Sequence, residues 1–338
     1  YVKEYDRKMQ YNRAICEGHN FSPGSPQQVG YALAMRGNWL PTTRKKRQLA
    51  TGSDTLRKVD DPLVTNIIDY RHERKMLGTY LVPWSKEPGR ATTRFNLDAR
   101  TARISSANYN LTNVPHELRG AFVGDFIAVD ASQLELREMQ YLSGDQRMKD
   151  VFDRGQSIHV DTANALYGYR EHWDKESKQY HSSKNTNFCI PYGGGIPRIA
   201  DTAGVSFGEA ARILSVWKTT YSQAWKWTKE TGNAAVRGEK IETVGGRKML
   251  IHWDEEGEEG VRKRGVNYPI QTSAGETLRK MITEMWHPAM VLQVHDELIY
   301  DQDLMPVKWT DQEIMDRCEW LGPVRTPVEV KRFRRWGD

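Results

Sequence analysis

The alternation of apolar and polar positions is clearest near the C-terminal end of the chain. Residues 292–294 and 298–300 form two mostly apolar runs, and the tripeptide His295-Asp296-Glu297 separates them. Two short strands joined by a tight turn explain this pattern. Asp296 would then stand at the end of a rigid strand, where a cation that prefers oxygen ligands can bind. The alternative is an ordinary solvated turn, because Asp and Glu are common turn residues.

A second apolar run also ends in a carboxylate. Residues 126–129 predict a buried strand, and Asp130 follows them directly. If the strands that end near Asp130 and Asp296 are neighbours, the two carboxylates can hold a pair of Mg²⁺ ions. Two such ions, about 4 Å apart, stabilise the attacking and leaving oxygens of an in-line displacement. The pattern itself leaves open whether the strands are neighbours, and a lone aspartate at a strand end is more often solvated.

A third pattern has the period of a helix. Lys184, Phe188 and Tyr192 are spaced four residues apart, so on one helix they share a face. A cation and two aromatic side chains on one face suit a nucleoside triphosphate. The alternative is an amphipathic helix with two core aromatics and a lysine whose stem is buried. Pro191 should kink or end this helix, because proline lacks an N–H and clashes with the preceding turn.

Composition limits the class of protein. The chain has 338 residues and a net charge of +5, which allows several subdomains and is compatible with a polyanionic partner. Its three cysteines are widely separated, so they imply no disulfide framework and suit a reducing compartment. No apolar stretch reaches the length of a membrane span, and no signal peptide is visible. Because the chain begins with Tyr1, we expect it to be part of a longer protein.

Taken in order, the three patterns resemble motifs A, B and C of the family A DNA polymerases, the DNA polymerase I family. Motif A corresponds to residues 130–137, motif B to residues 184–193 and motif C to residues 293–297. The resemblance covers nearly the whole chain. Further matching segments are residues 21–28, 70–74, 93–96, 101–106, 110–115, 157–159 and 267–275. Ordered together, these blocks form a highly specific signature.

The resemblance implies an α+β protein with a right-hand polymerase fold: an antiparallel palm sheet, helical fingers and an abbreviated helical thumb. A partial thumb and thumb base should occupy residues 1–88. The palm should come in two parts, residues 89–145 with motif A and residues 237–338 with motif C. The fingers, with motif B, should fill residues 146–236 and place Trp217, Trp225 and Trp227 on helices.

Local patterns add detail to this outline. The helical pattern that starts at Pro62 should end near Gly78, and the helix ahead of motif C should begin near Gln271. Residues 242–247 should form a hairpin with a Gly-Gly turn. The acidic stretch 254–259 should be a surface loop, and the basic run 44–47 should lie in an irregular loop.

The resemblance implies a catalytic role for four residues. Asp130 and Asp296 would bind two Mg²⁺ ions, for which Mn²⁺ can substitute, and the carbonyl of Ala131 would supply a further oxygen. Glu297 would support these ligands rather than bind directly. Lys184 would pair with the triphosphate near the leaving pyrophosphate.

The same resemblance implies a nucleotide site and a DNA-binding surface. Phe188 would pack on the incoming sugar and base, and Tyr192 would lie near the templating base. Gln133, Glu135 and His159 complete the nucleotide site, although a lone histidine is often only structural. The residues implied to face the primer–template backbone and minor groove are Arg103, Asn110, Asn113, Asn267, Gln271 and His295. Arg137 is expected to make an internal ion pair.

The sequence departs from the family in three places. Tyr180 stands four residues before Lys184, where the family usually has arginine, and a tyrosine cannot replace a charged bidentate fork. Either Lys178 or His181 compensates, or the affinity for nucleotide is lower. Ala131 stands where the family often has tyrosine, which opens space near the metals. Pro191 interrupts the fingers helix and leaves the position of Tyr192 open.

These residues predict template-directed addition of dNTPs to a primer 3′-hydroxyl, with release of pyrophosphate. One alternative is a single-subunit RNA polymerase, but Glu135 favours DNA synthesis because a glutamate at this position blocks a ribose 2′-hydroxyl in the family. The other alternative is a non-catalytic DNA-binding subunit, which retention of Asp130, Lys184 and Asp296 disfavours. No segment resembles a proofreading exonuclease, so an upstream domain, a separate subunit or a processivity factor are expected partners. The expected location is the cytoplasm of a bacterium or phage-infected host, or an organelle.

Overall fold

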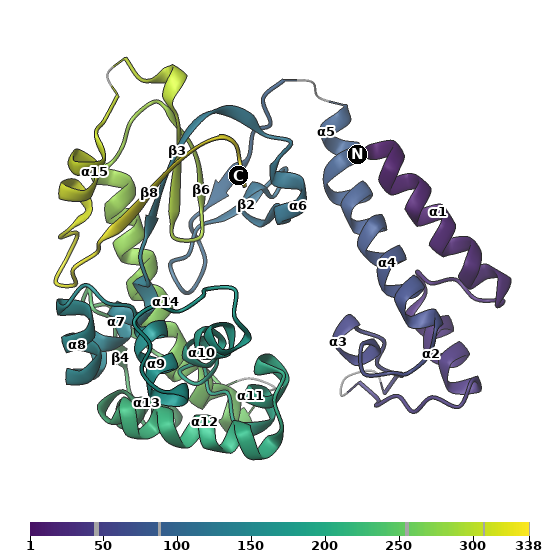
Figure 1. The fold of residues 1–338 in the computed structure, drawn as a ribbon, viewed down its shortest axis with the longest axis horizontal. Helices are drawn as coiled ribbons and strands as arrows, with labels where there is room; N and C mark the ends of the chain where they lie inside the picture. The colour runs from purple at the N-terminus through teal and green to yellow at the C-terminus, as the bar shows by residue number, and fades with distance from the viewer. Residues whose placement is uncertain (44–46, 87–88, 254–256, 307, 338) are drawn as a thin grey trace. The chain divides into compact units, whose positions relative to one another are not determined.

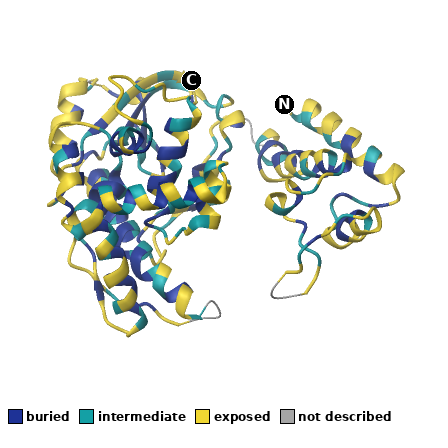
Figure 2. Cartoon of the chain, turned by 60° about the horizontal axis from the view of Figure 1, so that its bottom comes forward, coloured by how far each residue is buried: buried dark blue, intermediate teal, exposed yellow. Residues whose placement is uncertain are grey.

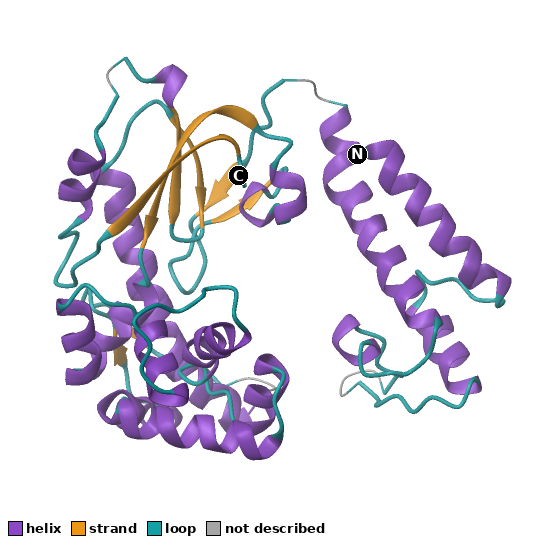
Figure 3. Ribbon diagram, in the orientation of Figure 1, coloured by secondary structure: helices purple, strands orange, loops and turns teal. Residues whose placement is uncertain are grey.

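The computed structural model describes residues 1–43, 47–86, 89–253, 257–306 and 308–337 (Figure 1). The chain divides into two compact units, Tyr1–Arg94 and Phe95–Asp338. The first unit is helical, and the second combines an antiparallel sheet with most of the helices (Figure 3). The predicted α+β class is therefore confirmed. No helix within the described ranges has both the length and the apolar character that crossing a membrane requires.

The first unit is built around the long helices α1 (Val2–Gly18) and α4 (Leu63–Lys75). α2 (Pro26–Met35) begins at Ser25, whose hydroxyl accepts a hydrogen bond from the Gln28 N–H. Proline at the first helical position suits this start, because that N–H would have no helical partner. A short helix, α3 (Ser53–Leu56), completes a core that includes Cys16, Leu33 and Ile67.

The predicted helix end near Gly78 is wrong. The helix continues from α4 through a π-helical segment, η1 (Met76–Leu81), into α5 (Val82–Ser85). A glycine ends a helix when it adopts the left-handed conformation, but Gly78 keeps a negative φ. Its neighbours Met76, Leu77, Tyr80 and Leu81 are buried, so their packing carries the helix past the glycine.

The basic run predicted to lie in a loop falls mostly outside the described residues, since only Arg47 of residues 44–47 is described. The segments on either side are held together by an isolated antiparallel bridge between Thr42 and Leu49. Hydrogen bonds from Thr43 N–H to the Gln48 carbonyl (2.7 Å) and from Ala50 N–H to the Pro41 carbonyl (2.7 Å) reinforce it.

The second unit is organised by a four-stranded antiparallel sheet in the order β6-β7-β3-β8. Its strands are β3 (Val123–Ala131), β6 (Met290–Val294), β7 (Glu297–Asp301) and β8 (Val328–Arg335). Helices α14 (Gly257–Glu284) and α15 (Asp311–Cys318) pack on one face, where Ile127 and Val129 join Leu278, Met281 and Ile314 in a core. Strand side chains alternate between the two faces, so Asp130 belongs to the other face.

Small elements surround the sheet. The three-residue strands β1 (Arg94–Asn96) and β2 (Ser105–Ala107) pair with each other. The two-residue strands β4 (Ile241–Glu242) and β5 (Lys248–Met249) form a second pair. The second pair confirms the predicted hairpin, and its Gly246 has a φ of +84°. Short helices lie at η2 (Leu111–Asn113), α6 (His116–Arg119) and η3 (Gln302–Leu304).

Seven helices separate β3 from β4: α7 (Leu134–Ser143), α8 (Gln146–Asp153), α9 (Ile158–Tyr167), α10 (Lys178–Cys189), α11 (Ile196–Ala203), α12 (Phe207–Thr220) and α13 (Ser222–Val236). Their starts are encoded locally, because Ser157, Ser177 and Ser206 each accept a backbone N–H at the first turn of α9, α10 and α12. The helix-rich character predicted for residues 146–236 is confirmed, and Trp217, Trp225 and Trp227 all lie on helices.

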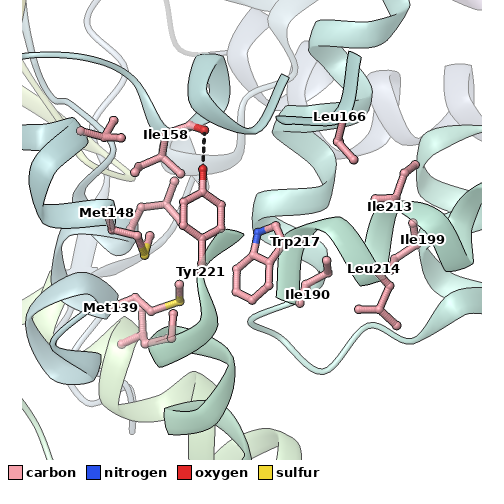
Figure 4. Packing of buried hydrophobic residues seen from close by; sticks show 14 of the residues in the cluster. Met139, Met148, Ile158, Leu166, Ile190, Ile199, Ile213, Leu214, Trp217 and Tyr221 are labelled. Carbon is pink, nitrogen blue, oxygen red and sulfur yellow. Dashed lines mark hydrogen bonds between the residues drawn. The ribbon is translucent and has the colours of Figure 1, made fainter. Parts of the chain in front are cut away.

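The helices share a core around Trp217 and Tyr221, which are almost completely buried. Figure 4 shows Tyr221 beside Met139 and Met148, with its hydroxyl directed at the Ile158 carbonyl, and Trp217 beside Ile190. Figure 2 colours the chain by burial, and buried and exposed residues occur on the same helices.

Two predictions about α14 are wrong. The helix begins at Gly257, far ahead of Gln271, and continues through Pro269. Glu258 and Glu259, which were expected in a surface loop, therefore lie in its first turn, where negative charge is favourable; residues 254–256 lie outside the described residues. Close packing of α14 on α13 offsets the backbone hydrogen bond that Pro269 cannot donate. The two helices are so close that a Cβ at Gly265 would come within 2.4 Å of the Ala235 Cβ.

Candidate nucleotidyl-transfer site

The two predicted metal-binding aspartates lie at the same end of the sheet. β3 and β7 are hydrogen-bonded neighbours, and Asp130 is the register partner of Glu297. Only His295 and Asp296 separate β6 from β7, and the left-handed φ of His295 (+53°) tightens this turn. The Ala131 N–H donates a hydrogen bond of 3.0 Å to the Asp296 carbonyl, which ties the turn to the end of β3. The strands that end near Asp130 and Asp296 are therefore neighbours, a point that the sequence pattern left open.

The carboxylates at this end of the sheet destabilise one another's charges. Burial, followed by the charges of Glu135 and Asp130, raises the pKa of Asp296 to about 6. Burial also raises the pKa of Asp130, against the opposing effect of Lys331 and Lys184. The pKa of Glu297 is raised by burial and by Asp130. A cation bound beside these carboxyl groups would lower their pKa values and favour their ionised forms.

The donor set suits magnesium. Carboxylate oxygens are the ligands that Mg²⁺ prefers, and it keeps several positions for water and substrate phosphate. Among the described residues, no three His, Cys, Asp or Glu side chains are grouped as a complete protein-only metal site would require. An ion at Asp130 and Asp296 would therefore need ligands besides these side chains, such as the Ala131 carbonyl, water or substrate phosphate.

The connection from β3 to α7 places two further predicted residues. Gln133 adopts a left-handed conformation (φ +54°) and begins α7. Its side-chain oxygen accepts hydrogen bonds from the Ile158 N–H (3.0 Å) and the Ser157 hydroxyl (3.3 Å). The Gln133 amide thus joins the starts of α7 and α9 and positions Glu135 on the first turn of α7.

Glu135 is held by two donors. Its carboxylate accepts hydrogen bonds from the Arg103 guanidinium and from the Tyr192 hydroxyl. Burial, followed by the Glu135 charge, raises the pKa of Tyr192 well above its ordinary range, so Tyr192 remains a donor. Gln271 also hydrogen-bonds Tyr192. Arg103, ahead of β2, and Tyr192, in the loop after α10, thus meet at the Glu135 carboxylate on α7, and Gln271 on α14 joins them through Tyr192.

The prediction that Lys184, Phe188 and Tyr192 share one helix holds only for the first two. α10 ends at Cys189, two residues before Pro191, so the predicted interruption is confirmed and Tyr192 lies beyond the helix. Lys184 is exposed, and Phe188 retains 38% exposure. Phe188 packs against the ring of His159, with ring centroids 5.5 Å apart. Neither residue belongs to the buried core.

The protonation of His159 follows from its neighbours. The Trp217 indole N–H can only donate, and it donates to the Asn187 side-chain oxygen at 2.9 Å. The Asn187 amide nitrogen therefore faces His159 Nδ1, at 3.1 Å, and that nitrogen must accept. Burial, with a smaller effect of Lys184, lowers the pKa of His159 to about 4. His159 is thus neutral, with its proton on Nε2.

Tyr180, which replaces the family arginine, is buried, and its hydroxyl hydrogen-bonds the Ser157 side chain. Of the two residues expected to compensate, Lys178 is exposed at the first turn of α10, and His181 lies 3.6 Å from a carboxylate oxygen of Glu176.

The residues predicted to face DNA are of two kinds. Asn110 is a structural hub, because its side-chain oxygen accepts from Ser106, Thr112 and Asn113 at 2.8–3.0 Å. Asn267 instead has a buried side-chain oxygen without a partner among the described residues. Gln293, which was not predicted to face DNA, has one too, and its amide nitrogen donates to the His295 carbonyl. Unsatisfied buried oxygens are costly, so both are candidates for contacts with a bound ligand.

The expected ion pair of Arg137 is not found among the described residues. Arg137 is buried, donates a hydrogen bond of 2.9 Å to the Ser132 carbonyl and stacks 4.1 Å from the centre of the Phe152 ring. Burial lowers its pKa to about 10. The aromatic ring and the carbonyl take the place of the expected carboxylate.

Sequence reasoning missed Lys331 and Glu138. Lys331 lies on β8 beside β3, and its charge acts on both Asp130 and Glu297. Glu138 is fully buried between α7 and α14, where it accepts a hydrogen bond of 2.7 Å from the Thr277 hydroxyl. An apolar-rich helix with a charged residue on its buried face is a signal that could have identified Glu138; Lys331 depends on strand pairing, which the sequence does not reveal.

Known proteins resemble this chain along nearly its full length. The DNA polymerase I of Thermus filiformis is 28% identical over 93% of this chain and 41% of its own length. That of Helicobacter pylori is 27% identical over 96% of this chain and 39% of its own length. The chain thus spans about two fifths of these relatives.

The fold has a solved counterpart. The polymerase domain of Pol1 from M. smegmatis superposes with a TM-score of 0.84 at 22% identity, covering 99% of this chain and 65% of that domain's chain. The right-hand polymerase fold is therefore confirmed. The sequence profile of DNA polymerase family A matches residues 2–338. The chain belongs to DNA polymerase family A.

Proposed function

We propose that this chain catalyses template-directed DNA synthesis, joining the α-phosphate of a dNTP to a primer 3′-hydroxyl and releasing pyrophosphate. The observation that carries the proposal is the pairing of β3 with β7, which brings Asp130 and Asp296 to one end of the sheet. Family membership supports the same reaction. The mycobacterial polymerase domain was solved with a DNA primer–template and dNTP, the two substrates proposed here.

Asp130 and Asp296 would hold two Mg²⁺ ions, with the Ala131 carbonyl as a further oxygen and Glu297 as a supporting charge. When bound, the ions activate the primer 3′-oxygen and stabilise the charge that develops on the α-phosphate and the leaving oxygen. The chain's task is to hold both carboxylates in fixed positions at one end of the sheet. The hydrogen bond from the Ala131 N–H to the Asp296 carbonyl serves this positioning.

The nucleotide would lie along the exposed face of α10. Lys184 would pair with the β- and γ-phosphates, where its charge stabilises the leaving pyrophosphate. His159 would donate from Nε2 to a phosphate oxygen, because its Nδ1 is already accepting a hydrogen bond. Phe188 would pack on the sugar, and Glu135 would exclude a 2′-hydroxyl. Gln133 and Tyr192 would act by positioning Glu135 and the end of α10.

Residues 89–145 and 237–338 would form the palm, residues 146–236 the fingers and residues 1–88 a partial thumb. Arg103, Asn110, Asn113, Asn267, Gln271 and His295 would face the primer–template. Minor-groove acceptors are similar for all correct base pairs, so such contacts can test pairing without reading sequence.

Primer extension tests the proposal. The purified chain is incubated with a labelled primer–template and four dNTPs, with Mg²⁺, with Mn²⁺ or with a chelator. We expect extension only with a divalent ion. A chain that binds primer–template but adds no nucleotide under any of these conditions would instead be a non-catalytic binding subunit, and a chain that prefers rNTPs would be an RNA polymerase.

A further inference from the structure

Two lysines share the ring of Trp225 on the surface formed by α12, α13 and α14. The Nζ of Lys218, on the last turn of α12, lies 4.4 Å from the ring centre, and the Nζ of Lys229, one turn along α13, lies 4.3 Å from it. Trp225 is partly buried and packs against the helical core. The ring therefore holds two ammonium groups in a fixed place.

No carboxylate among the described residues is in direct contact with either lysine of this pair, whereas the charges around the pair have such partners. Lys226 lies 3.7 Å from Glu230, and Arg262 pairs with Glu258. Within the described ranges, neither Lys218 nor Lys229 lies within ion-pair distance of a carboxylate. Burial, followed by the charges of Lys218 and Arg262, lowers the pKa of Lys229, against a smaller opposing effect of the Glu259 charge. The cluster carries a repulsion that a bound anion would relieve.

The cluster is continuous with the candidate site through α14. Arg262 hydrogen-bonds Asn233 on α13. The stem of the adjacent Lys263 covers Gly193, where a Cβ would come within 2.8 Å of the lysine Cγ. Gly193 follows Tyr192 directly. Basic side chains thus extend from Lys263, beside Gly193 and Tyr192, along α14 to Lys229 and Lys218.

We propose that Lys218, Trp225 and Lys229 form a binding site for the backbone phosphates of single-stranded DNA, outside the nucleotide-addition site. Two adjacent ammonium groups suit a phosphodiester chain, which gains affinity by releasing counterions and needs no particular base. Since the ring already engages the lysines, charge rather than base stacking provides the binding. The inference rests on the proposed function and identifies the strand as the unpaired template ahead of the primer.

A purely structural role makes a different prediction. Lysine stems can cover a partly exposed tryptophan, and cation–π contact can hold the ammonium groups over its ring without any ligand. Lys218 also lies in the last turn of α12, where positive charge is favourable. If these effects explain the cluster, removing the charges lowers the melting temperature and leaves DNA binding unchanged.

The test compares two primer–templates, one with a long single-stranded 5′ template overhang and one with a blunt end. Dissociation constants are measured by fluorescence anisotropy across a salt series for the parent and for Lys218→Gln/Lys229→Gln. We expect binding of the long overhang to weaken about tenfold and its salt slope to fall by about 1–2, with the blunt substrate unchanged. Lys226→Gln is the matched control, because its lysine is paired with Glu230, and it should change neither value.

Lys218→Arg/Lys229→Arg should restore overhang binding, since it keeps both charges. Unchanged overhang binding in the glutamine variant, or equal loss on both substrates, overturns the inference. So does a loss confined to dNTP use, which would assign the cluster to free triphosphate. The proposed function is tested separately: if the parent extends no primer but binds single strands through these lysines, the proposed function fails, and the single-strand site stands without its assignment to the template.

Discussion

The hydroxyl of Tyr192 donates a hydrogen bond to the carboxylate of Glu135, joining the loop after α10 to the first turn of α7. Arg103 donates to the same carboxylate. Two donors from separate segments fix the position of Glu135 more tightly than helix packing alone would. A fixed carboxylate can exclude a substituent by contact, which a mobile one cannot.

Removing this carboxylate should relax sugar choice. Glu135→Ala should reduce the preference for dNTP over rNTP by on the order of 10²-fold, because a methyl group leaves room for the 2′-hydroxyl. Single-nucleotide incorporation of a matched dNTP and rNTP gives the ratio. Tyr192→Phe is the control for position, since it removes one donor and keeps Arg103, and it should change the ratio far less. An unaltered ratio in Glu135→Ala would remove Glu135 from this role.

Loss of either aspartate proposed to bind metal should reduce nucleotide addition and leave DNA binding largely intact. Asp130→Ala and Asp296→Ala should each lower nucleotide addition by on the order of 10³-fold or more, because each removes ligands for the catalytic ions. Phosphate contacts elsewhere should keep the dissociation constant for primer–template within a few-fold of the parent. Asp125→Ala, on the same strand, is the control; Asp125 contacts Gln302 and Lys308 instead. Substantial extension by either variant in Mg²⁺ would refute the assignment.

Glu138 should make stability depend on pH. Burial, followed by the charge of Glu276, raises its pKa from the ordinary 4.5 to about 7, while Thr277 and Lys280 oppose this rise. The folded state therefore holds the proton more tightly than the unfolded state. The stability this provides is complete below about pH 4.5 and is lost as pH rises to about 7.

Glu138→Gln should remove this dependence. The shift corresponds to up to about 3 kcal/mol in the free energy of unfolding, so the variant should lose less stability than the parent between pH 5 and pH 8 (about 3 kcal/mol less at most). Urea denaturation at several pH values measures it. Glu284→Gln, at the exposed end of α14, should follow the parent. Parallel pH profiles for Glu138→Gln and the parent would show that the carboxyl is ionised in the fold.

The sequence predicted the strands and turns around Asp130 and Asp296 better than it predicted where the helices begin and end. The strand ends at Asp130 and Asp296, the hairpin at residues 242–247 and the interruption at Pro191 all follow from local chemistry that the structure keeps. The pairing of β3 with β7 could not be read locally, because it joins segments far apart in the chain. The resemblance to a family supplied that relationship.

Helix boundaries were wrong where packing outweighs local signals. Gly78 and Pro269 are both helix-breaking residue types, yet helices pass through both. Buried neighbours hold the backbone helical at Gly78, and close contact between α13 and α14 does so at Pro269. The prediction of an ion pair for Arg137 was wrong for a similar reason. The charge of a buried guanidinium needs a favourable contact, but the fold decides whether a carboxylate or an aromatic ring supplies it.

The exposed face of α10 allows a test that separates nucleotide binding from packing. Phe188→Tyr should raise the use of ddNTPs relative to dNTPs about tenfold or more, because a tyrosine hydroxyl can replace the contact that a missing 3′-hydroxyl leaves unmade, and an unpaired polar group in such a site is costly. Lys184→Ala should raise KM for dNTP and also lower kcat, since it removes a charge that acts on the leaving pyrophosphate. Both residues are exposed on α10, so neither substitution should lower the melting temperature by more than a few degrees. Lys178→Ala, at the first turn of the same helix, is the control for nonspecific loss of positive charge. If Phe188 and Lys184 only pack the helix, all nucleotides suffer equally and the melting temperature falls; an unchanged ddNTP/dNTP ratio together with that fall would favour packing over nucleotide contact.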